Sequence, residues 1–348
     1  MMNKFTSQKS FRIINIITLV LLLIALFVII TLWQQYPNIL NKGQHIHARP
    51  NAMLPDGQGM YESCSPAKGS VCLNRLQQMA NAGFTVVINY DQLYGTQQQE
   101  LAYAQQATAL HMQIIWAVND PVFWSGTKLI EKYRDLAPTC KCSDNTGFIR
   151  YVVGLVKNLP ATWGYYVGDE VKASEHARMK AFSDFIKQLD PSHPRLFVAS
   201  GNDSATMSTL TPFVDTADVL AGDIYPVGTN GEAITVVGTV AQSIQSMAIR
   251  NNKQSAVVIQ SFAWNQYPNE SWRCSPYPGC ASFPTATQMR QMRDLVLQNS
   301  QPRLVLWYSF FDITNKGAPP SQWSNLVQAA EPLSTLAKSH PPIGHSGR

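Results

Sequence analysis

The strongest constraint on the fold is a repeated alternation of short apolar runs with longer amphipathic stretches across residues 51–340. Eight runs read as buried parallel strands because they are nearly continuous in apolar, β-branched and aromatic residues. These runs cover residues 59–63, 84–90, 113–119, 162–168, 195–200, 219–225, 256–264 and 303–310. The helical stretches cover residues 72–82, 97–111, 148–159, 175–189, 234–250, 286–299 and 322–337. This order predicts an α/β fold, a (β/α)8 TIM barrel.

A doubly wound open sheet is the main alternative to the barrel, because it has the same alternation of strands and helices. The nucleotide-binding motifs typical of such sheets are missing from the sequence. No Gly-x-Gly-x-x-Gly follows the first strand, and no Gly-x-x-x-x-Gly-Lys-Ser/Thr occurs in the chain. The closed barrel is therefore the preferred prediction.

An uncharged aliphatic segment at residues 13–33 precedes the barrel. Its length matches the ~20 residues that a helix needs to cross a bilayer. Lys4, Lys9 and Arg12 precede the segment, which predicts a cytoplasmic N-terminus at 1–12. We expect a signal anchor at 13–33, a tether at 34–50, the barrel at 51–340 on the extracytoplasmic side, and a flexible tail at 341–348. Cleavage of the segment, which would secrete the barrel, is the alternative.

The charge distribution argues against a nucleic-acid partner. The formal net charge of the 348-residue chain is +5. The first 50 residues contain five of the 27 basic residues and no acidic one, so the rest of the chain has 22 of each sign. A nucleic-acid-binding domain needs a basic surface, which this neutral composition does not favour. The expected partner of the N-terminal helix is a membrane, and the oligomeric state stays open.

The six cysteines lie in three close pairs, which agrees with export to an oxidising compartment. We expect local disulfides within the pairs Cys64 and Cys72, Cys140 and Cys142, and Cys274 and Cys280. The bridge between Cys140 and Cys142 would close a tight ring. A zinc site is the alternative, but the sequence lacks a second Cys-x-x-Cys or a neighbouring His pair, so no metal site is predicted.

Candidate site residues lie at the ends of the predicted strands, where the active sites of such barrels form. The carboxylates are Asp91, Asp169, Glu170 and Asp223. The aromatic and amide side chains are Tyr90, Trp116, Tyr225, Gln260, Trp264, Trp307 and Tyr308. Aromatic faces suit sugar rings, and carboxylates suit acid/base work or hydroxyl binding. The structural alternatives are that the aromatic side chains cap the barrel core and that an aspartate caps a helix.

Four segments resemble the ends of strands 4, 6, 7 and 8 in TIM-barrel glycoside hydrolases. They begin at Gly164 (GYYVGDE), Gly222 (GDIYP), Gln260 (QSFAW) and Trp307 (WYSF). The resemblance implies that Glu170 takes the place of the strand-4 acid/base. It departs at strand 7, where Gln260 stands at the position of a nucleophilic glutamate. Asp223 is the nearest substitute.

The adjacent acids Asp169 and Glu170 are also similar to those of the substrate-assisted hexosaminidases, in which the aspartate orients an N-acetyl group and the glutamate is the acid. The expected function is therefore a membrane-anchored glycoside hydrolase that needs no metal or organic cofactor. In it Glu170 acts as acid/base with a pKa raised by burial or by Asp169, and Asp169 or Asp223 is the nucleophile, second base or orienting group. A carbohydrate-binding barrel without catalysis, and a scaffold without a ligand, are the alternatives.

Overall fold

The computed structural model describes residues 54–119, 128–200, 205–229, 232–269, 282–315 and 317–339. Eight parallel strands in sequence order form a closed barrel. The strands are β1 (Gln58–Glu62), β2 (Val86–Asn89), β3 (Gln113–Ala117), β4 (Thr162–Asp169), β5 (Arg195–Ser200), β6 (Val219–Ile224), β7 (Gln254–Gln260) and β8 (Leu304–Tyr308). Pairing of β1 with β8 closes the ring. The predicted barrel and all eight predicted strands are confirmed.

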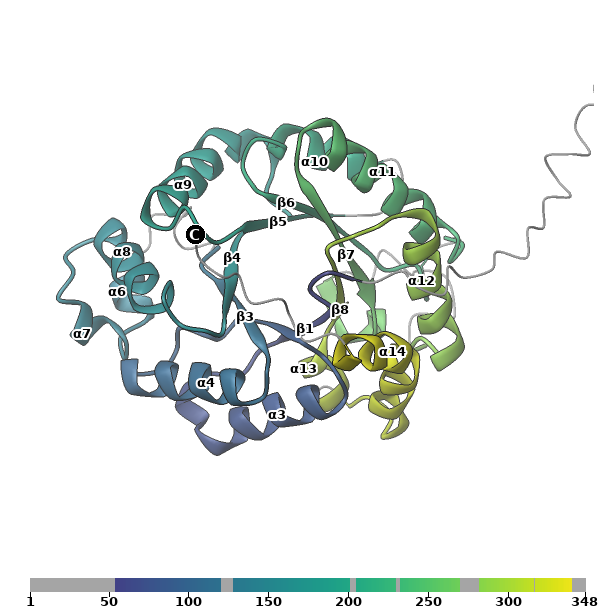
Figure 1. Ribbon diagram of the computed structural model, residues 1–348, viewed down its shortest axis with the longest axis horizontal. Helices are drawn as coiled ribbons and strands as arrows, with labels where there is room; N and C mark the ends of the chain where they lie inside the picture. Colours follow the sequence, from purple (N-terminus) through teal and green to yellow (C-terminus); the bar gives the residue numbers. More distant parts are fainter. Residues whose placement is uncertain are drawn as a thin grey trace, which may run out of the picture. The chain divides into compact units, whose positions relative to one another are not determined.

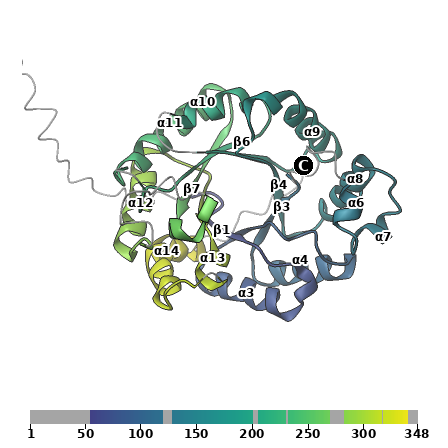
Figure 2. The ribbon, with the colours of Figure 1, turned by 180° about the vertical axis from the view of Figure 1, so that it is seen from behind.

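Helices surround the strands as an outer ring, which is seen from both ends in Figures 1 and 2. The α-helices are α3 (Ser70–Asn81), α4 (Gln97–Ala109), α6 (Leu129–Lys132), α7 (Ala137–Cys140), α8 (Asn145–Val156), α9 (His176–Leu189), α10 (Ala205–Leu210), α11 (Val236–Arg250), α12 (Ala286–Asn299), α13 (Phe310–Asn315) and α14 (Ser321–Ser339). Short 3₁₀ turns are η1 (Pro66–Lys68), η2 (Ala173–Glu175), η3 (Thr211–Phe213) and η4 (Trp264–Gln266). The seven predicted helices are present, whereas the short α6, α7, α10 and α13 were not predicted.

Local capping explains where several helices begin. Thr96 and Gln99 form a reciprocal capping box at the start of α4, and Thr285 and Gln288 form another at the start of α12. The Asp144 carboxylate accepts a hydrogen bond from Gly147 N–H at the start of α8. These side chains satisfy N–H groups that have no partner within the helix.

Side chains that alternate along the strands divide the core into two layers. One layer fills the barrel interior and includes Val86, Ile115, Leu196, Val258 and Leu306. The other lies between the strands and the helices and includes Val87, Ile114, Phe197, Val257 and Val305. Because successive strand residues point to opposite faces, adjacent residues on one strand belong to different layers.

The N-terminal predictions fall outside the described residues. The expected span at 13–33 and tether at 34–50 are among the residues that the structure does not describe. Within the described part of the chain, no helix has the length and apolar character that a bilayer crossing requires.

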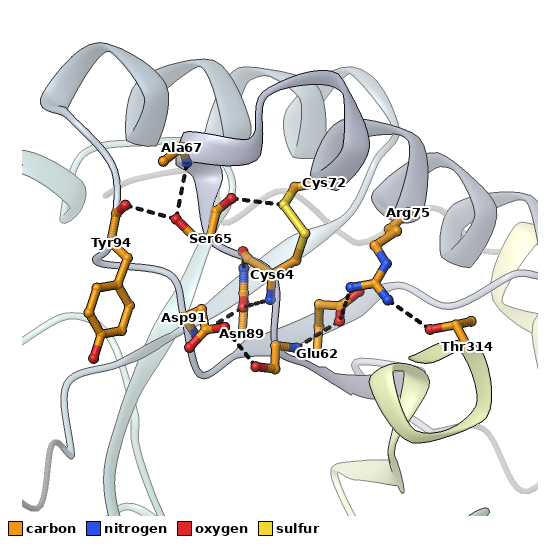
Figure 3. The surroundings of a disulfide bond; sticks show 11 residues. Glu62, Cys64, Ser65, Ala67, Cys72, Arg75, Asn89, Asp91, Tyr94 and Thr314 are labelled. Carbon is orange, nitrogen blue, oxygen red and sulfur yellow. Dashed lines mark hydrogen bonds and ion pairs between the residues drawn. A yellow bond between two sulfur atoms is a disulfide. The ribbon is translucent and has the colours of Figure 1, made fainter. Parts of the chain in front are cut away.

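Two of the three predicted disulfides are present. Cys64 is bonded to Cys72, and Cys140 to Cys142. Cys274 and Cys280 lie outside the described residues. Cys64 and Cys72 are both fully buried, and their bond joins the loop after β1 to α3 (Figure 3). We infer that this bridge stabilises the loop at the carboxyl end of β1.

Replacing both Cys64 and Cys72 with serine is expected to lower the free energy of unfolding by about 2–3 kcal/mol, because the bridge closes an eight-residue separation in the unfolded chain. Urea denaturation of the parent and the double variant measures this loss. The matched control is the double serine variant of Cys140 and Cys142, whose separation of two residues predicts a smaller effect. Equal losses in the two double variants would contradict the expectation.

Buried carboxyl groups lie behind β1 and β2, outside the barrel interior. The Glu62 carboxylate pairs with Arg75 at 3.2 Å, and burial raises the pKa of Glu62 to about 7. Glu100 on α4 accepts hydrogen bonds from Gln92 Nε2 at 2.8 Å and from Gly95 N–H at 3.0 Å. Burial nevertheless raises the pKa of Glu100 to about 8. Glu100 is therefore expected to hold its proton at neutral pH.

The Glu100→Gln variant is expected to lose part of the pH dependence of stability. Between pH 4.5 and 8 the folded chain retains a proton on Glu100 that the unfolded chain releases. The free energy of unfolding of the parent therefore falls as pH rises through that window, by up to about 1.4 kcal/mol per pH unit for this group. Denaturation curves from pH 5 to 8 should be flatter for Glu100→Gln than for the exposed control Glu131→Gln; parallel curves would refute this assignment.

Candidate active site

A cavity of about 200 Å³ opens at the carboxyl end of the barrel strands. The residues that line it come from β1, β4, β5, β6 and β8 and from the segments that follow β2, β4, β6 and β7. They are Tyr61, Tyr90, Asp169, Glu170, Val198, Ser200, Asp223, Tyr225, Phe262, Trp264, Tyr267 and Tyr308. We call this the inner cavity. Among these described lining residues three are acidic and none is basic.

The predicted carboxylates Asp169, Glu170 and Asp223 all line the inner cavity. Asp169 is the last residue of β4, Glu170 follows it directly, and Asp223 lies near the end of β6. Asp223 is 7 % exposed. The barrel topology brings β4 and β6 to the same rim, on either side of β5. Residues that are more than fifty positions apart in the sequence thus share one site.

The Asp169 carboxylate is held by tyrosines. Tyr90 donates a hydrogen bond from its hydroxyl to Asp169 Oδ2 at 3.0 Å, and Tyr166 also donates to Asp169. Tyr61 in turn donates to the Tyr166 hydroxyl at 3.3 Å. Burial raises the pKa of Asp169 to about 6, and the neighbouring Glu170 charge adds to the rise, against the opposing effect of the two tyrosines. Asp169 is thus an oriented carboxyl group with a pKa raised to about 6.

Glu170 has a left-handed backbone conformation, with φ of 46°. A non-glycine residue in this region carries backbone strain, which is found most often at functional sites. The Glu170 N–H donates to Val198 O at 2.9 Å, which ties the residue to β5. Its side chain is exposed, so the burial expected of Glu170 is not found. Asp169, which is half-buried, is the less exposed carboxyl group of the pair.

Aromatic rings form most of the cavity wall. Tyr308 is the central ring, with centroid distances of 5.1 Å to Tyr61, 5.7 Å to Tyr225 and 5.8 Å to Phe262. Trp264 packs against both Tyr225 and Phe262. The predicted residues Tyr90, Tyr225, Trp264 and Tyr308 therefore come together in one site. Offset and edge contacts of this kind fix ring positions and give a rigid, partly apolar wall.

Trp116 and Trp307 do not line the cavity, and the prediction that they shape a sugar site is corrected. Both side chains are fully buried in the layer between strands and helices. Trp116 Nε1 donates to Thr162 Oγ1 at 2.9 Å, and Trp307 Nε1 donates to Gln58 Oε1 at 2.9 Å. The cause is strand alternation: Ile115, Ala117 and Tyr308 face the interior, so their neighbours Trp116 and Trp307 face outward.

Gln260 is also buried and does not line the inner cavity. Its Oε1 accepts a hydrogen bond from Val227 N–H at 2.8 Å. Its Nε2 donates to Val227 O at 2.9 Å and to Phe262 O at 3.1 Å. The amide therefore fastens the segment after β6 to the end of β7, and the prediction that Gln260 binds substrate is corrected.

Sequence reasoning missed five lining residues of the inner cavity, Tyr61, Val198, Ser200, Phe262 and Tyr267. Ser200 is the last residue of β5, so reading the end of that predicted strand would have found it. Tyr61 is the penultimate residue of β1, which ends at Glu62 rather than at 63 as predicted. Phe262 and Tyr267 follow β7, which ends at Gln260 rather than at 264 as predicted. Tyr267 donates to Asp312 Oδ2 at 2.6 Å, and Asp312 is buried outside the described cavity lining.

A second, outer cavity of about 480 Å³ adjoins the inner one. It shares Tyr90 and Asp169 with the inner cavity. Its other lining residues are Asp91, Tyr94, Ala117, Asn119, Lys132, Tyr133, Val171, Lys172 and Glu175. The predicted residue Asp91 therefore belongs to the outer cavity. Together the two cavities span the barrel rim from β6 and β8 to β2 and β3.

No protein-family model matches the chain, and no curated protein is significantly similar to it in sequence. Solved structures match it in fold. A GH2 beta-galacturonidase from Eisenbergiella tayi has a TM-score of 0.52 at 11 % identity, over 79 % of this chain and 51 % of that one. A GH99 endo-alpha-mannosidase from Bacteroides thetaiotaomicron has a TM-score of 0.51 at 13 % identity, over 80 % of this chain and 82 % of that one. The chain therefore shares the TIM-barrel fold with both of these structures. It spans about half the length of the galacturonidase.

Proposed function

We propose that the chain is a glycoside hydrolase. The observation that carries the proposal is the inner cavity, in which Asp169, Glu170 and Asp223 share an aromatic-walled space at the carboxyl end of the strands. Glycoside hydrolysis needs carboxyl groups on both sides of a sugar-binding site and proceeds through a cationic, oxocarbenium-like transition state. Three acidic side chains without a basic one among the described lining residues favour that positive charge.

We assign the general acid/base role to Glu170. Its exposed side chain lines the cavity, and its strained backbone is fixed to β5 through Val198. A positioned group of this kind can give a proton to the leaving oxygen and then take one from water. Fixing the backbone at a cost of order 1–3 kcal/mol is consistent with a functional demand at this position.

We assign an orienting role to Asp169 and the second catalytic role to Asp223. Two tyrosine hydroxyls already donate to Asp169, so its carboxylate is held in one orientation and can accept a hydrogen bond from substrate. Asp223 is nine-tenths buried beside the cavity, which suits a carboxylate that acts as nucleophile or base. In the substrate-assisted route Asp169 orients an N-acetyl group of the substrate, and no protein nucleophile is needed. This route is compatible with a Gln260 amide that is hydrogen-bonded to the Val227 backbone.

The second candidate function is carbohydrate binding without catalysis. The hydrogen bonds between the Gln260 amide and the Val227 backbone favour binding without catalysis, because the end of β7 then supplies no reacting group. The aromatic wall would bind sugars in either case. The two candidates differ in whether bond cleavage accompanies binding.

We further propose that residues 13–33 anchor the barrel on the extracytoplasmic side of a membrane. The uncharged segment and the preceding basic residues support this placement, as do the two disulfides of the barrel. Glycosidic bonds in an external oligo- or polysaccharide are then within reach of the cavity.

A glycan panel tests the proposed function directly. The full-length protein is incubated with manno-, xylo-, cello- and chito-oligosaccharides, and release of new reducing ends is measured beside binding by calorimetry. Hydrolysis of at least one series supports the glycosidase. Binding without hydrolysis supports the second candidate, and the absence of both would refute each of them.

A further inference from the structure

The loop after β1, at residues 63–65, is held in place by several independent bonds and contacts residues of the outer cavity (Figure 3). The Asn89 side chain accepts from Cys64 N–H at 3.0 Å and donates to Cys64 O at 2.7 Å. The Cys64–Cys72 bridge joins the same loop to α3. This loop contacts two residues of the outer cavity, Asp91 and Tyr94.

Two serines of the loop after β1 position Asp91 and Tyr94. Ser63 Oγ donates to Asp91 Oδ2 at 2.7 Å, and Ser65 Oγ donates to Tyr94 O at 2.8 Å. The first bond fixes the Asp91 side chain and the second fixes the Tyr94 backbone, and bonds that hold a site in place before a ligand arrives reduce the entropy lost on binding. The outer cavity is thus preorganised rather than an accidental gap between loops.

The chemistry of the outer cavity suits a sugar unit. The Tyr94 ring lies 4.9 Å from Tyr133 in an edge-on contact and 5.8 Å from the Lys132 ammonium group. This arrangement holds a half-buried aromatic ring at the cavity wall. Carboxylate and ammonium groups surround it, since Asp91, Lys132, Lys172 and Glu175 all line the cavity. An aromatic face with hydrogen-bonding groups of both signs fits a ring that carries many hydroxyls.

The position of the outer cavity relates it to the inner one. Both cavities are lined by Tyr90 and Asp169, so the hydrogen-bonded pair forms their common boundary. A glycan with one unit in the inner cavity passes this boundary as it enters the outer one. Its linking bond then lies beside Asp169 and next to Glu170.

We propose that the outer cavity is a second saccharide subsite, in which Tyr94 stacks against the sugar unit adjacent to the bond that is cleaved. The inference rests on the proposed function, because it assumes a saccharide in the inner cavity. It implies that the substrate has at least two linked sugar units and that the second unit contributes to affinity through Tyr94.

The test compares affinities for mono-, di- and trisaccharides of the manno-, xylo-, cello- and chito-series by calorimetry. The full-length protein carries Glu170→Gln so that bound glycans remain intact. For at least one series we expect about tenfold tighter binding of the disaccharide than of the monosaccharide. Adding Tyr94→Ala should reduce that gain to less than twofold, and Tyr94→Phe, which keeps the ring, should restore most of it.

The matched control is Tyr151→Ala on α8, which removes a partly buried tyrosine that lines neither cavity. It should keep the tenfold gain. A gain that survives Tyr94→Ala, or equal affinities for mono- and disaccharides in the parent, overturns the outer subsite while leaving the proposed function in place. Failure of every saccharide to bind overturns the proposed function itself.

Discussion

Replacing Glu170 with glutamine is expected to lower the rate of glycoside hydrolysis by about 100- to 10,000-fold, the usual contribution of a general acid/base. Glutamine has nearly the same shape as glutamate but cannot give or take the proton at the leaving oxygen. The substitution keeps the side chain at the cavity and the N–H bond to Val198 O. The measurement is kcat on whichever oligosaccharide series the parent cleaves.

Measuring oligosaccharide affinity and stability shows whether Glu170→Gln has lost only the catalytic step or also its fold. Glu170→Gln should bind the same oligosaccharide within a few-fold of the parent and unfold at the same urea concentration. Glu131→Gln, which removes a carboxylate that is 64 % exposed on α6, should keep parental turnover. If Glu170→Gln keeps the turnover of the parent, Glu170 is not the general acid/base, and Asp169 and Asp223 become the candidates for that role.

Replacing Asp169 with asparagine is expected to stabilise the folded chain at pH 8 while reducing activity. Burial raises the pKa of Asp169 from 3.8 to about 6, so the folded state holds its proton more tightly than the unfolded state does. The stability of the parent therefore falls as pH rises from about 4 to 6, and the penalty remains above pH 6. Because the side chain is only half-buried, solvent screening reduces the effect to roughly 1–2 kcal/mol.

Urea denaturation at pH 4 and pH 8 measures this effect. The free energy of unfolding of Asp169→Asn should equal that of the parent at pH 4 and exceed it at pH 8. The reason is that the amide is neutral at both pH values and its oxygen still accepts a hydrogen bond from the Tyr90 hydroxyl. The exposed control Asp135→Asn should show no such gain. Turnover should fall at pH 8 even as stability rises, the trade-off expected of an active-site carboxylate. A variant that is less stable than the parent at pH 8 would show that Asp169 serves the fold.

The strand-end rule found the acidic part of the site but misplaced two tryptophans. Asp169, Glu170 and Asp223 follow apolar runs, and the parallel barrel brings all such run ends to one rim. Trp116 and Trp307 also lie near run ends, but they point outward. Applying the two-residue period to Trp307 and Tyr308 shows that only one of these neighbours can face the interior, so the error was avoidable in part.

Strand β4 shows why periodicity alone does not place every side chain. Its pairing shifts register against β3 and again against β5, between Tyr166 and Gly168. As a result Trp163, Tyr166 and Asp169, each three positions apart, all face the interior or its cavity, whereas regular alternation from Trp163 would turn Tyr166 outward. Bulges of this kind re-aim side chains beside active sites. Sequence letters carry no direct sign of such a shift.

The sequence by itself determined the number and order of the strands, the barrel, the paired cysteines and the acidic rim, because these depend on local composition and spacing. Only the tertiary structure decided which aromatic rings face the cavity, that the Gln260 amide is hydrogen-bonded to the Val227 backbone, and that Asp169 is half-buried with a raised pKa. Those outcomes depend on packing between strands far apart in the chain. A pKa or a cavity wall is a property of the neighbours that folding supplies, whereas a strand is already encoded in its own few residues.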